Sequence, residues 1–263
     1  MSVTIQALID RLLAETPGGL RHPTVDTIKA GDASQAVRGV VTTCMATVAV
    51  IRQAIALGAN LIITHEPTYY NHLDETEALA KDPVYLAKKE LIASHGLVVW
   101  RYHDHIHALQ PDGIITGLLQ ALGWERFADP LARGLCVIPP TSLWDLVTLF
   151  KGRLELDMVR VLGDPAMLCE RVGLAVGAAG GARQIAFLRE QNLDLLVCGE
   201  INEWETAEYV RDADLLGHKR ALLLLGHINS EEPGMAWLAV WLRGLFPDLA
   251  VTHIPAGDVL GCV

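Results

Sequence analysis

At residues 58–67 the chain reads Gly-Ala-Asn-Leu-Ile-Ile-Thr-His-Glu-Pro, a short apolar run that ends in two polar residues and a proline. The apolar part has the length and the β-branched content of a buried strand. Pro67 prevents a smooth continuation of that strand and biases Glu66 toward an extended backbone. His65 and Glu66 are therefore predicted to leave the strand tip on opposite sides, where they could serve two different metal ions. Taken alone, the pair is better explained as a loop histidine beside a solvated glutamate.

A second segment, 103–107, reads His-Asp-His-Ile-His and follows directly on an apolar run. If the extended conformation continues, His103, His105 and His107 point to one face and Asp104 to the other. Three imidazoles on one face would repel one another when protonated, so the arrangement favours a bound cation or a carboxylate partner. The alternative is a solvated loop, where histidines at this spacing cost little.

The third segment, 226–231, reads Gly-His-Ile-Asn-Ser-Glu and also follows an apolar run. Ser230 is predicted to cap the next helix, with Glu231 in its first turn. The helix dipole alone favours an acidic residue there, which is the simpler explanation of Glu231. The two other segments add weight to His227 and Glu231, because imidazole and carboxylate groups at three strand ends indicate a transition-metal centre.

Apolar runs of strand length alternate with helical patterns along the whole chain. This alternation predicts an α/β fold with mixed, largely parallel sheets. An amphipathic helix is expected near the N-terminus, over residues 5–13. The predicted strands are 39–43, 61–64, 97–102, 172–176, 193–198, 221–225 and 250–254, and the predicted helices are 47–57, 77–94, 112–122, 143–154, 183–191, 203–212 and 235–245.

The alternation is interrupted at residues 127–140, where three prolines and a glycine occur. We interpret this stretch as the join between two similar α/β lobes, 1–128 and 129–263. The first lobe carries the first two histidine segments and the second lobe carries the third. A metal site that draws on both is expected to lie in the cleft between the lobes.

Composition restricts the partners. The chain has 263 residues, of which 51% are hydrophobic and 20% charged, which argues against disorder. A net charge of −10 would repel phosphate backbones, so nucleic acid is not an expected partner. No apolar run is long enough for a membrane span, and the N-terminus does not resemble a signal peptide, so a cytoplasmic location is expected. The five cysteines are scattered without a C-x-x-C pair and are expected to be buried thiols.

Four motifs resemble those of a known family, in the right order over most of the chain. Residues 58–67 are similar to G-A-D-L-I-I-T-H-H-P of the Nif-three-like dinuclear metal-centre proteins, which are often named type 2 GTP cyclohydrolase I. Residues 103–108 resemble that family's H-T-N-L-D-A, 194–200 its D-x-x-I-T-G-D, and 226–231 its G-H-Y-A-T-E. Asp26 and Gly31 fall where an early D-N-x-G-L pattern would lie.

The resemblance implies a two-lobed α/β fold without an inserted domain, a toroidal homo-hexamer built as a trimer of dimers, and two divalent metal ions in the interlobe cleft. Glu66 stands where the family has a second histidine, and His107 stands where it has an aspartate. Because this exchange keeps the ligand types and the charge, the second metal position is expected to be retained. The metal ligands carried over from the family are His65, Glu66, His107, His227 and Glu231, and His103 is a further candidate.

Two alternatives stay open: a metal-free chain, and occupancy of only the site built from His65, His227 and Glu231. The patch 194–200 departs from its motif at Glu200, so no role is assigned to it. The glycine-rich stretch 177–183 is interpreted as a tight turn, with phosphate binding at the following helix as the alternative.

Mixed imidazole and carboxylate ligands suit zinc, iron, manganese or nickel, and two such ions could supply hydroxide at neutral pH. The leading hypothesis is a metal-dependent hydrolase that acts on a small polar or nucleotide-like substrate, with Glu66, Asp104 or His105 as the proton carrier. The alternative is a non-enzymatic, metal-binding hexameric ring that acts in metal storage, delivery or regulation.

Overall fold

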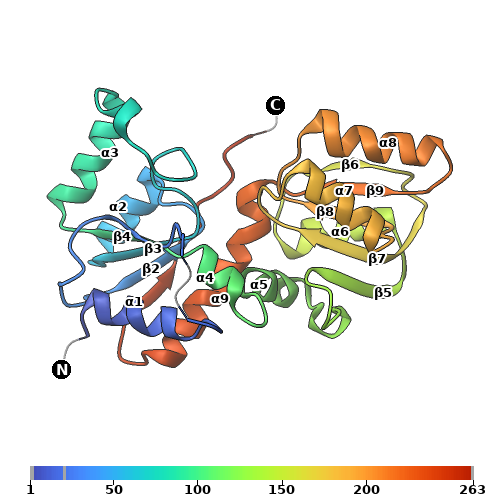
Figure 1. Cartoon of the computed structure of the whole chain (residues 1–263). Coiled ribbons are helices and arrows are strands. Elements are labelled where there is room, and N and C mark those ends of the chain that lie inside the picture. The colour runs from blue at the N-terminus through green and yellow to red at the C-terminus, as the bar shows by residue number, and fades with distance from the viewer. Residues whose placement is uncertain (1–2, 20–21, 262–263) are drawn as a thin grey trace. The chain divides into compact units, whose positions relative to one another are not determined.

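The computed structural model describes residues 3–19 and 22–261, which form two compact units, each built on a five-stranded sheet (Figure 1). Unit 1 comprises Met1–Ile114 and Gly234–Ala256, and unit 2 comprises Ile115–Pro233 and Gly257–Val263. Both sheets mix parallel and antiparallel pairs, so the predicted α/β class with mixed sheets is confirmed.

The sheet of unit 1 has the order β1-β4-β3-β2-β10 and is parallel except at β1. Every residue of β2, β3 and β4 is buried, as expected for strands covered on both faces. Val41, Ile62 and Val99 face the core under α2 and α3, while Thr42, on the other face, donates a hydrogen bond to the Met235 carbonyl of α9. The strands are β1 Ile28–Ala30, β2 Val40–Thr43, β3 Leu61–Thr64, β4 Val98–Arg101 and β10 Val251–His253, and the helices include α1 Ile5–Ala14, α2 Val48–Ala56, η1 Glu77–Leu79, α3 Pro83–Ser94 and α4 Asp104–Ala108.

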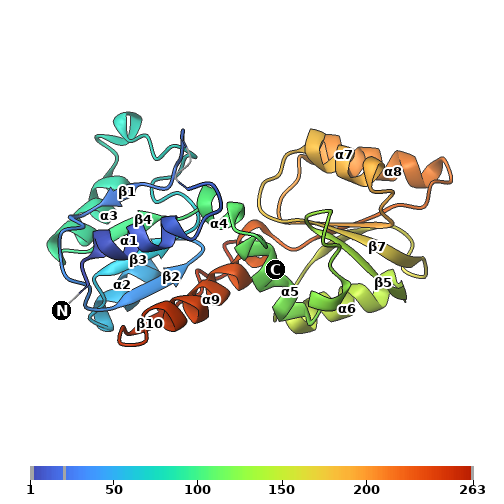
Figure 2. The same ribbon diagram turned by 60° about the horizontal axis from the view of Figure 1, so that its bottom comes forward.

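The sheet of unit 2 has the order β5-β7-β8-β9-β6, with antiparallel strands at both edges. Helices α5 and α6 cover one face and α7 and α8 the other (Figure 2). The strands are β5 Leu135–Ser142, β6 Arg160–Leu162, β7 Leu168–Ala175, β8 Leu195–Cys198 and β9 Ala221–Leu224, and the helices include α5 Gly113–Leu122, η2 Glu125–Phe127, α6 Leu143–Arg153, α7 Gly181–Glu190, the π-helix η3 Glu203–Ala207 and α8 Glu208–Leu215. Helix α9, His227–Leu245, begins in unit 2 and continues into unit 1.

Each predicted strand is present, but three edge strands, β1, β5 and β6, were not expected. Residues 127–140, predicted as an interlobe join, instead contain most of β5. The prolines at 139 and 140 fit there because β5 is an edge strand whose pairing with β7 is irregular between Val137 and Thr141. Pro and Gly therefore mark a bulged edge of the second sheet.

The units differ from the predicted lobes 1–128 and 129–263. Helix α5 belongs to unit 2 from Ile115 onward because Leu118, Leu119 and Leu122 pack in the core of the second sheet. The last strand, β10, returns to pair in parallel with β2 of unit 1. The division consequently falls inside α9, between Pro233 and Gly234.

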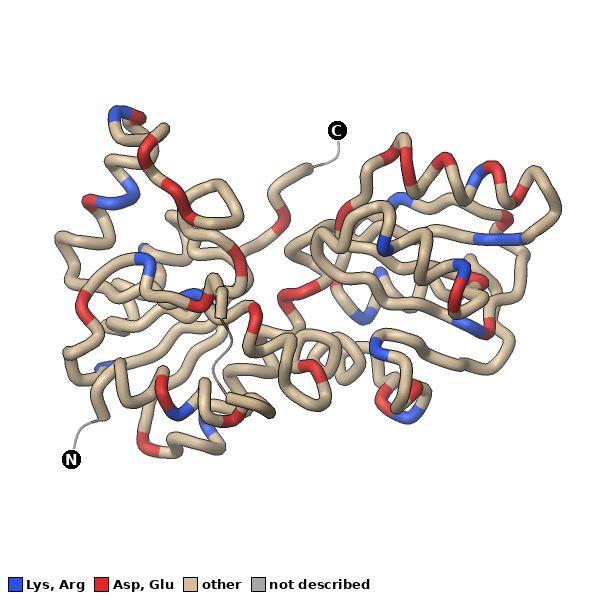
Figure 3. The backbone as a smooth tube through the Cα atoms, in the orientation of Figure 1, with Lys and Arg blue, Asp and Glu red and all other residues tan. Residues whose placement is uncertain are grey.

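Three expectations drawn from the composition can be compared with the structure. None of the described helices combines the length and the apolar character that a membrane span requires. The four cysteines among the described residues are buried and none of them is in a disulfide, as expected, while Cys262 lies outside the described residues. Lys and Arg are interspersed with acidic residues along both units (Figure 3), and the exclusion of nucleic acid stays a prediction.

Candidate metal centre

Two of the histidine segments meet at one edge of the unit 1 sheet. Strands β3 and β4 are parallel neighbours and end in register, with Thr64 opposite Arg101. The residues that follow each strand therefore emerge side by side at the carboxyl end, where α/β sheets place their ligand sites. His65 and Glu66 are fixed there by backbone hydrogen bonds to the carbonyls of residues 43 and 44.

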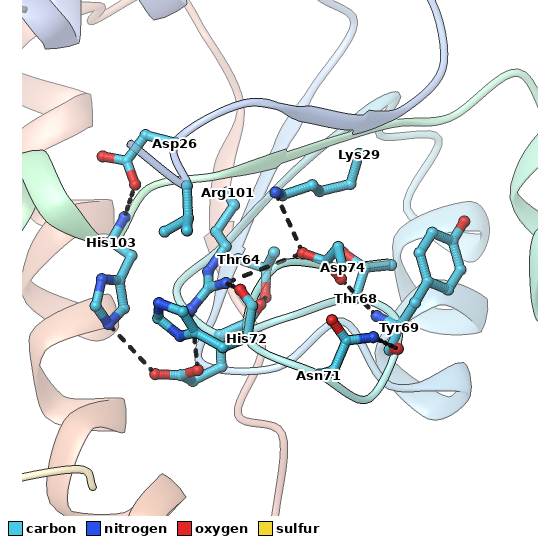
Figure 4. A network of polar contacts seen from close by, with 12 residues as sticks. Asp26, Lys29, Thr64, Thr68, Tyr69, Asn71, His72, Asp74, Arg101 and His103 are labelled. Carbon is cyan, nitrogen blue, oxygen red and sulfur yellow. Dashed lines mark hydrogen bonds and ion pairs between the residues drawn. The ribbon is translucent and has the colours of Figure 1, made fainter. Parts of the chain in front are cut away.

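The second segment is helical, so its predicted extended form is wrong. The chain leaves β4 at Arg101 and enters α4 after His103. Asp26 is the cause: its carboxylate accepts hydrogen bonds from the backbone N–H groups of His103, Asp104 and His105 at 2.7, 2.9 and 2.8 Å. Figure 4 shows the first of these bonds. Helical spacing then places His103 and His107 on one face of the segment and His105 on another.

His65, His103 and His107 form a compact cluster of imidazole rings. The ring centroids of His65 and His103 are 4.7 Å apart, and that of His107 lies 5.0 Å from His65 and 5.1 Å from His103. One nitrogen of each ring lies within 4.8 Å of the corresponding nitrogens of the other two. The structure thus brings together three of the predicted ligands from two strand ends.

All three rings are oriented in the same way. Nδ1 of His65 lies 3.2 Å from the Tyr102 carbonyl, and Nδ1 of His103 and of His107 lie 3.0 Å from the carboxylates of Asp104 and Asp112. These oxygens can only accept, so each Nδ1 is the nitrogen that donates, and in a neutral imidazole so placed Nε2 is the nitrogen with the lone pair. Histidines that ligate metals are normally held by an oxygen partner of this kind.

Burial and neighbouring groups shift the pKa values of His103 and Asp104 in this cluster. Burial and the neighbouring His65 lower the pKa of His103 to about 4, although Asp104 and Glu66 act in the opposite direction. Burial would by itself raise the pKa of Asp104, but hydrogen bonds from Val25 N–H, His103 and Thr24 outweigh it and lower that pKa to about 2. At neutral pH, a neutral imidazole therefore lies beside an ionised carboxylate that orients it.

Glu66 lies in the same cluster as His65, which differs from the prediction that the two point to opposite sides. Its Oε1 is 3.6 Å from Nε2 of His103, and its Oε2 is 3.3 Å from Arg101 Nη2. The strand stops at Thr64 and the chain bends, so the alternation of a strand no longer applies. Arg101 is fully buried and also donates to the backbone carbonyl of His65 at 3.0 Å (Figure 4).

Unit 2 holds the third segment, where His227 begins α9 directly after β9. Nδ1 of His227 lies 2.6 Å from Glu200 Oε1, and its Nε2 lies 3.1 Å from Glu231 Oε2. Ser230, predicted as a helix cap, instead lies inside α9 and donates to the carbonyl of residue 227, because the helix starts earlier than expected. Glu200 gives the patch 194–200 a role: it orients His227 as the oxygen partners in unit 1 orient their histidines.

The other candidate proton carriers are engaged elsewhere. His105 is fully buried and its Nδ1 lies 2.6 Å from Asp26 Oδ2, so it supports α4 instead of joining the ring cluster. Asp104 accepts from Thr24 Oγ1 at 2.8 Å and from the backbone of Val25 at 3.0 Å. The sequence did not lead us to predict Arg101, Asp112 and Glu200 as site residues. Glu200 follows a predicted strand, as the candidate histidines do, so its position could have marked it as a candidate.

Comparison with known proteins identifies relatives over almost the full length. The sequence model of the family described as Duf34/NIF3 (NGG1p interacting factor 3) matches residues 26–257. The chain is 24% identical over 226 residues to the GTP cyclohydrolase 1 type 2 homolog of Chlamydia trachomatis serovar D, covering 82% of this chain and 84% of that protein.

Solved structures share the fold. The hypothetical protein SA1388 of Staphylococcus aureus superposes with a TM-score of 0.77 at 17% identity, covering 100% of both chains. A Bacillus cereus protein related to NIF3 gives a TM-score of 0.78 at 14% identity, covering 100% of this chain and 99% of the other.

Proposed function

Because the chain belongs to the Duf34/NIF3 (NGG1p interacting factor 3) family, we propose that it is a metal-binding protein with a dinuclear divalent-metal centre. The observation that carries the proposal is the common orientation of His65, His103 and His107, each with Nδ1 on an oxygen partner and with one ring nitrogen within 4.8 Å of those of the other two. In unit 2 the Nδ1 of His227 likewise lies beside an oxygen, Glu200 Oε1, while its Nε2 faces the carboxylate of Glu231.

The donor set fits such a cation. Neutral imidazole suits zinc, iron and nickel, and a carboxylate such as Glu66 or Glu231 extends the range to manganese. One ring nitrogen of each of these three histidines lies within 4.8 Å of those of the other two, which is close enough for one cation to be held by all three. We propose His65, His103 and His107 as ligands, with Glu66, His227 and Glu231 as further donors and two ions per chain.

We further propose that the centre hydrolyses a small polar or nucleotide-like substrate. A divalent cation held by these residues would supply Lewis acidity for polarising a substrate oxygen and for lowering the pKa of water. Asp104 and Asp112 keep His103 and His107 in the tautomer that leaves Nε2 unprotonated. Glu66 is held by Arg101 and lies 3.6 Å from Nε2 of His103, which makes it the carboxylate best placed to accept a proton.

Metal content tests the first part. The protein is purified without added metal, under conditions that retain weakly bound ions, and analysed for elements alongside His103→Ala and His227→Ala. His95→Ala is the matched control, because His95 is exposed at the end of α3. We expect about two ions per chain in the wild type and the control, and a loss in the other variants. Wild-type protein without metal would reject the proposal.

Turnover tests the second part. Phosphoesters, nucleotides and cyclic amides are offered to the metal-loaded protein, to the chelator-treated protein and to Glu231→Gln. Hydrolysis that disappears on chelation and in the variant supports the hydrolase. Bound metal without turnover of any probe would favour the non-enzymatic metal-binding ring, for which native mass spectrometry should then show the proposed hexamer.

A further inference from the structure

The free edge of the unit 1 sheet borders a groove of about 720 Å³, and none of the candidate metal ligands is among its described lining residues. Strand β1 is the outermost strand on this side, with β4 as its neighbour. The consecutive residues 27–32 line the groove. Because successive side chains of a strand point to opposite faces, a lining without gaps places the backbone edge of β1 along the groove. Such an edge presents N–H and C=O groups for pairing with another strand.

A helix forms another wall of the groove. Four residues of α3 line it at the spacing of one helix face, and the loop 69–76 adds further residues; the four are Tyr85, Lys89, Ile92 and Ala93. Figure 2 shows β1 and α3 next to each other, and residues of the two elements are in contact. Protein modules that recognise extended peptides add the peptide as a further strand at an exposed sheet edge and take alternate side chains into pockets. The groove offers both features.

Four charged side chains line the groove, and three of them are already engaged. Lys29 and Asp74 form a buried ion pair at 3.3 Å, and Asp32 accepts two hydrogen bonds within its own turn. The Lys89 ammonium lies 5.7 Å from the centroid of the Tyr85 ring and forms no ion pair with any residue that the structure describes. Lys89 is therefore the charge that an occupant of the groove can neutralise, and a carboxylate is the group that does so.

The next turn of α3 provides an apolar surface. Ile92 is buried, Ala93 is exposed, and a Cβ at Gly96 would meet no atom within 4 Å. All three residues line the groove. The two small residues leave space next to the isoleucine, and burial of a large apolar side chain in this space is favourable.

We propose that this groove binds an extended peptide, which adds a strand to β1 and inserts one acidic and one apolar side chain. Alternate residues of a strand point to the same side and lie about 6.6–6.8 Å apart. Lys89 and the apolar surface follow each other along α3 by about one helical turn, which is about 5.4 Å. The two inserted side chains therefore belong to peptide residues that are separated by one position. This binding does not involve the metal centre, so it is independent of the proposed function and can be measured in chelator.

Calorimetric titration with three capped pentapeptides tests the proposal. Two of them carry glutamate and phenylalanine at positions two and four, in either order, with threonine elsewhere, and in the third peptide the two residues are adjacent. We expect one alternating peptide to bind at least about tenfold more tightly than the third, whose two side chains point to opposite sides. N-methylation of its backbone amides should abolish binding, because the added strand then cannot donate to β1. No binding of either alternating peptide, equal binding of all three, or unchanged binding after N-methylation would overturn the proposal.

Variants of exposed residues locate the binding. Lys89→Glu should weaken binding of the glutamate peptide about fivefold and favour a peptide with lysine in its place, while Lys81→Glu, outside the lining, should do neither. Ala93→Phe fills the apolar part and should block binding, and Ala87→Phe, an exposed position of α3 outside the lining, should not. Equal peptide affinities of each variant and its control would place the binding elsewhere and refute the site.

Hydrogen exchange of the wild type tests the strand pairing directly. The bound peptide should slow exchange at residues 28–31, and an unchanged pattern there would contradict the addition of a strand to β1. A second copy of this chain is the other occupant that could cover the edge. Protection of residues 28–31 that rises with protein concentration in the absence of peptide would assign the groove to a second copy and overturn the proposal.

Discussion

Asp26 is the residue on which the site of unit 1 should depend most, although it lies far from the rings in sequence. Its buried carboxylate accepts three backbone N–H groups at the start of α4 and also holds Nδ1 of His105 at 2.6 Å. Replacing it with alanine removes a helix cap, worth about 0.5–2 kcal/mol, and breaks a buried polar pair, for which about 3–5 kcal/mol is typical. Since the two losses overlap, we expect Asp26→Ala to lower the free energy of unfolding by about 4 kcal/mol.

The substitution Asp26→Ala should also weaken metal binding. Without the cap, α4 no longer fixes His103 and His107 on one face, so metal affinity should fall at least tenfold. For Asp26→Asn, the losses of stability and of metal affinity should both be smaller than for Asp26→Ala. The asparagine amide oxygen can still accept from His103 and Asp104, but its NH₂ group faces the two N–H donors of His105.

Urea unfolding and competition with a chelator measure the two effects. Asp10→Asn, an exposed carboxylate on α1, is the control and should change stability by less than about 0.5 kcal/mol. A destabilisation by Asp26→Ala of less than about 1 kcal/mol, or an unchanged metal affinity, would refute the view that Asp26 builds this part of the site.

Three further changes probe other parts of the chain. Burial lowers the pKa of Lys88 from 10.5 to about 8, despite the opposing charge of Asp74, so the unfolded chain binds more protons between these values. Stability should rise by about 3 kcal/mol as the pH rises through this window, and urea unfolding of Lys88→Met should lack that rise. Gly177 has φ +59°, and a Cβ there would lie 2.2 Å from Glu231 Oε1. Gly177→Ala should therefore lower the free energy of unfolding by about 2 kcal/mol, measured by thermal melting. The control Gly152→Ala has open space around it and should not destabilise α6. Asp112→Asn should weaken metal binding about 10–100-fold by chelator competition, and an unchanged affinity would show that the partner of His107 is dispensable.

The buried strands and the ligand-bearing ends could be predicted because they depend on local patterns. A strand such as β3 is buried at every position and apolar at all but its last residue, Thr64, and this leaves a clear signal. The edge strand β6 has Arg160 and Val161 exposed and is only three residues long, so no pattern marks it. Helix α4 was missed for another reason: its cap comes from Asp26, which lies 77 residues before His103.

The unit boundaries could not be predicted because they rest on packing between distant segments. The sequence of α5 does not indicate that its apolar face packs against the sheet of unit 2, and the sequence of β10 does not indicate that this strand pairs with β2. Ligand types depend on the residue alone and could be proposed from sequence. The oxygen partners that orient them depend on tertiary contacts, and Glu200 and Asp112 became visible only in the structure.

The two candidate ligand positions that depart from the resembled motifs, Glu66 and His107, each lie beside a side chain of ionisable type in unit 1, Arg101 and Asp112. Glu66 Oε2 faces the buried Arg101 at 3.3 Å, so part of the negative charge gained at this position is balanced inside the protein. His107 stands where the resembled family has an aspartate, and the carboxylate of Asp112, 3.0 Å from its Nδ1, is the oxygen partner that orients the ring. The exchange of ligand types is therefore accompanied by an exchange of charge in the surroundings. This compensation explains physically how both substitutions can be accommodated in one buried site, because neither leaves an isolated charge in the interior.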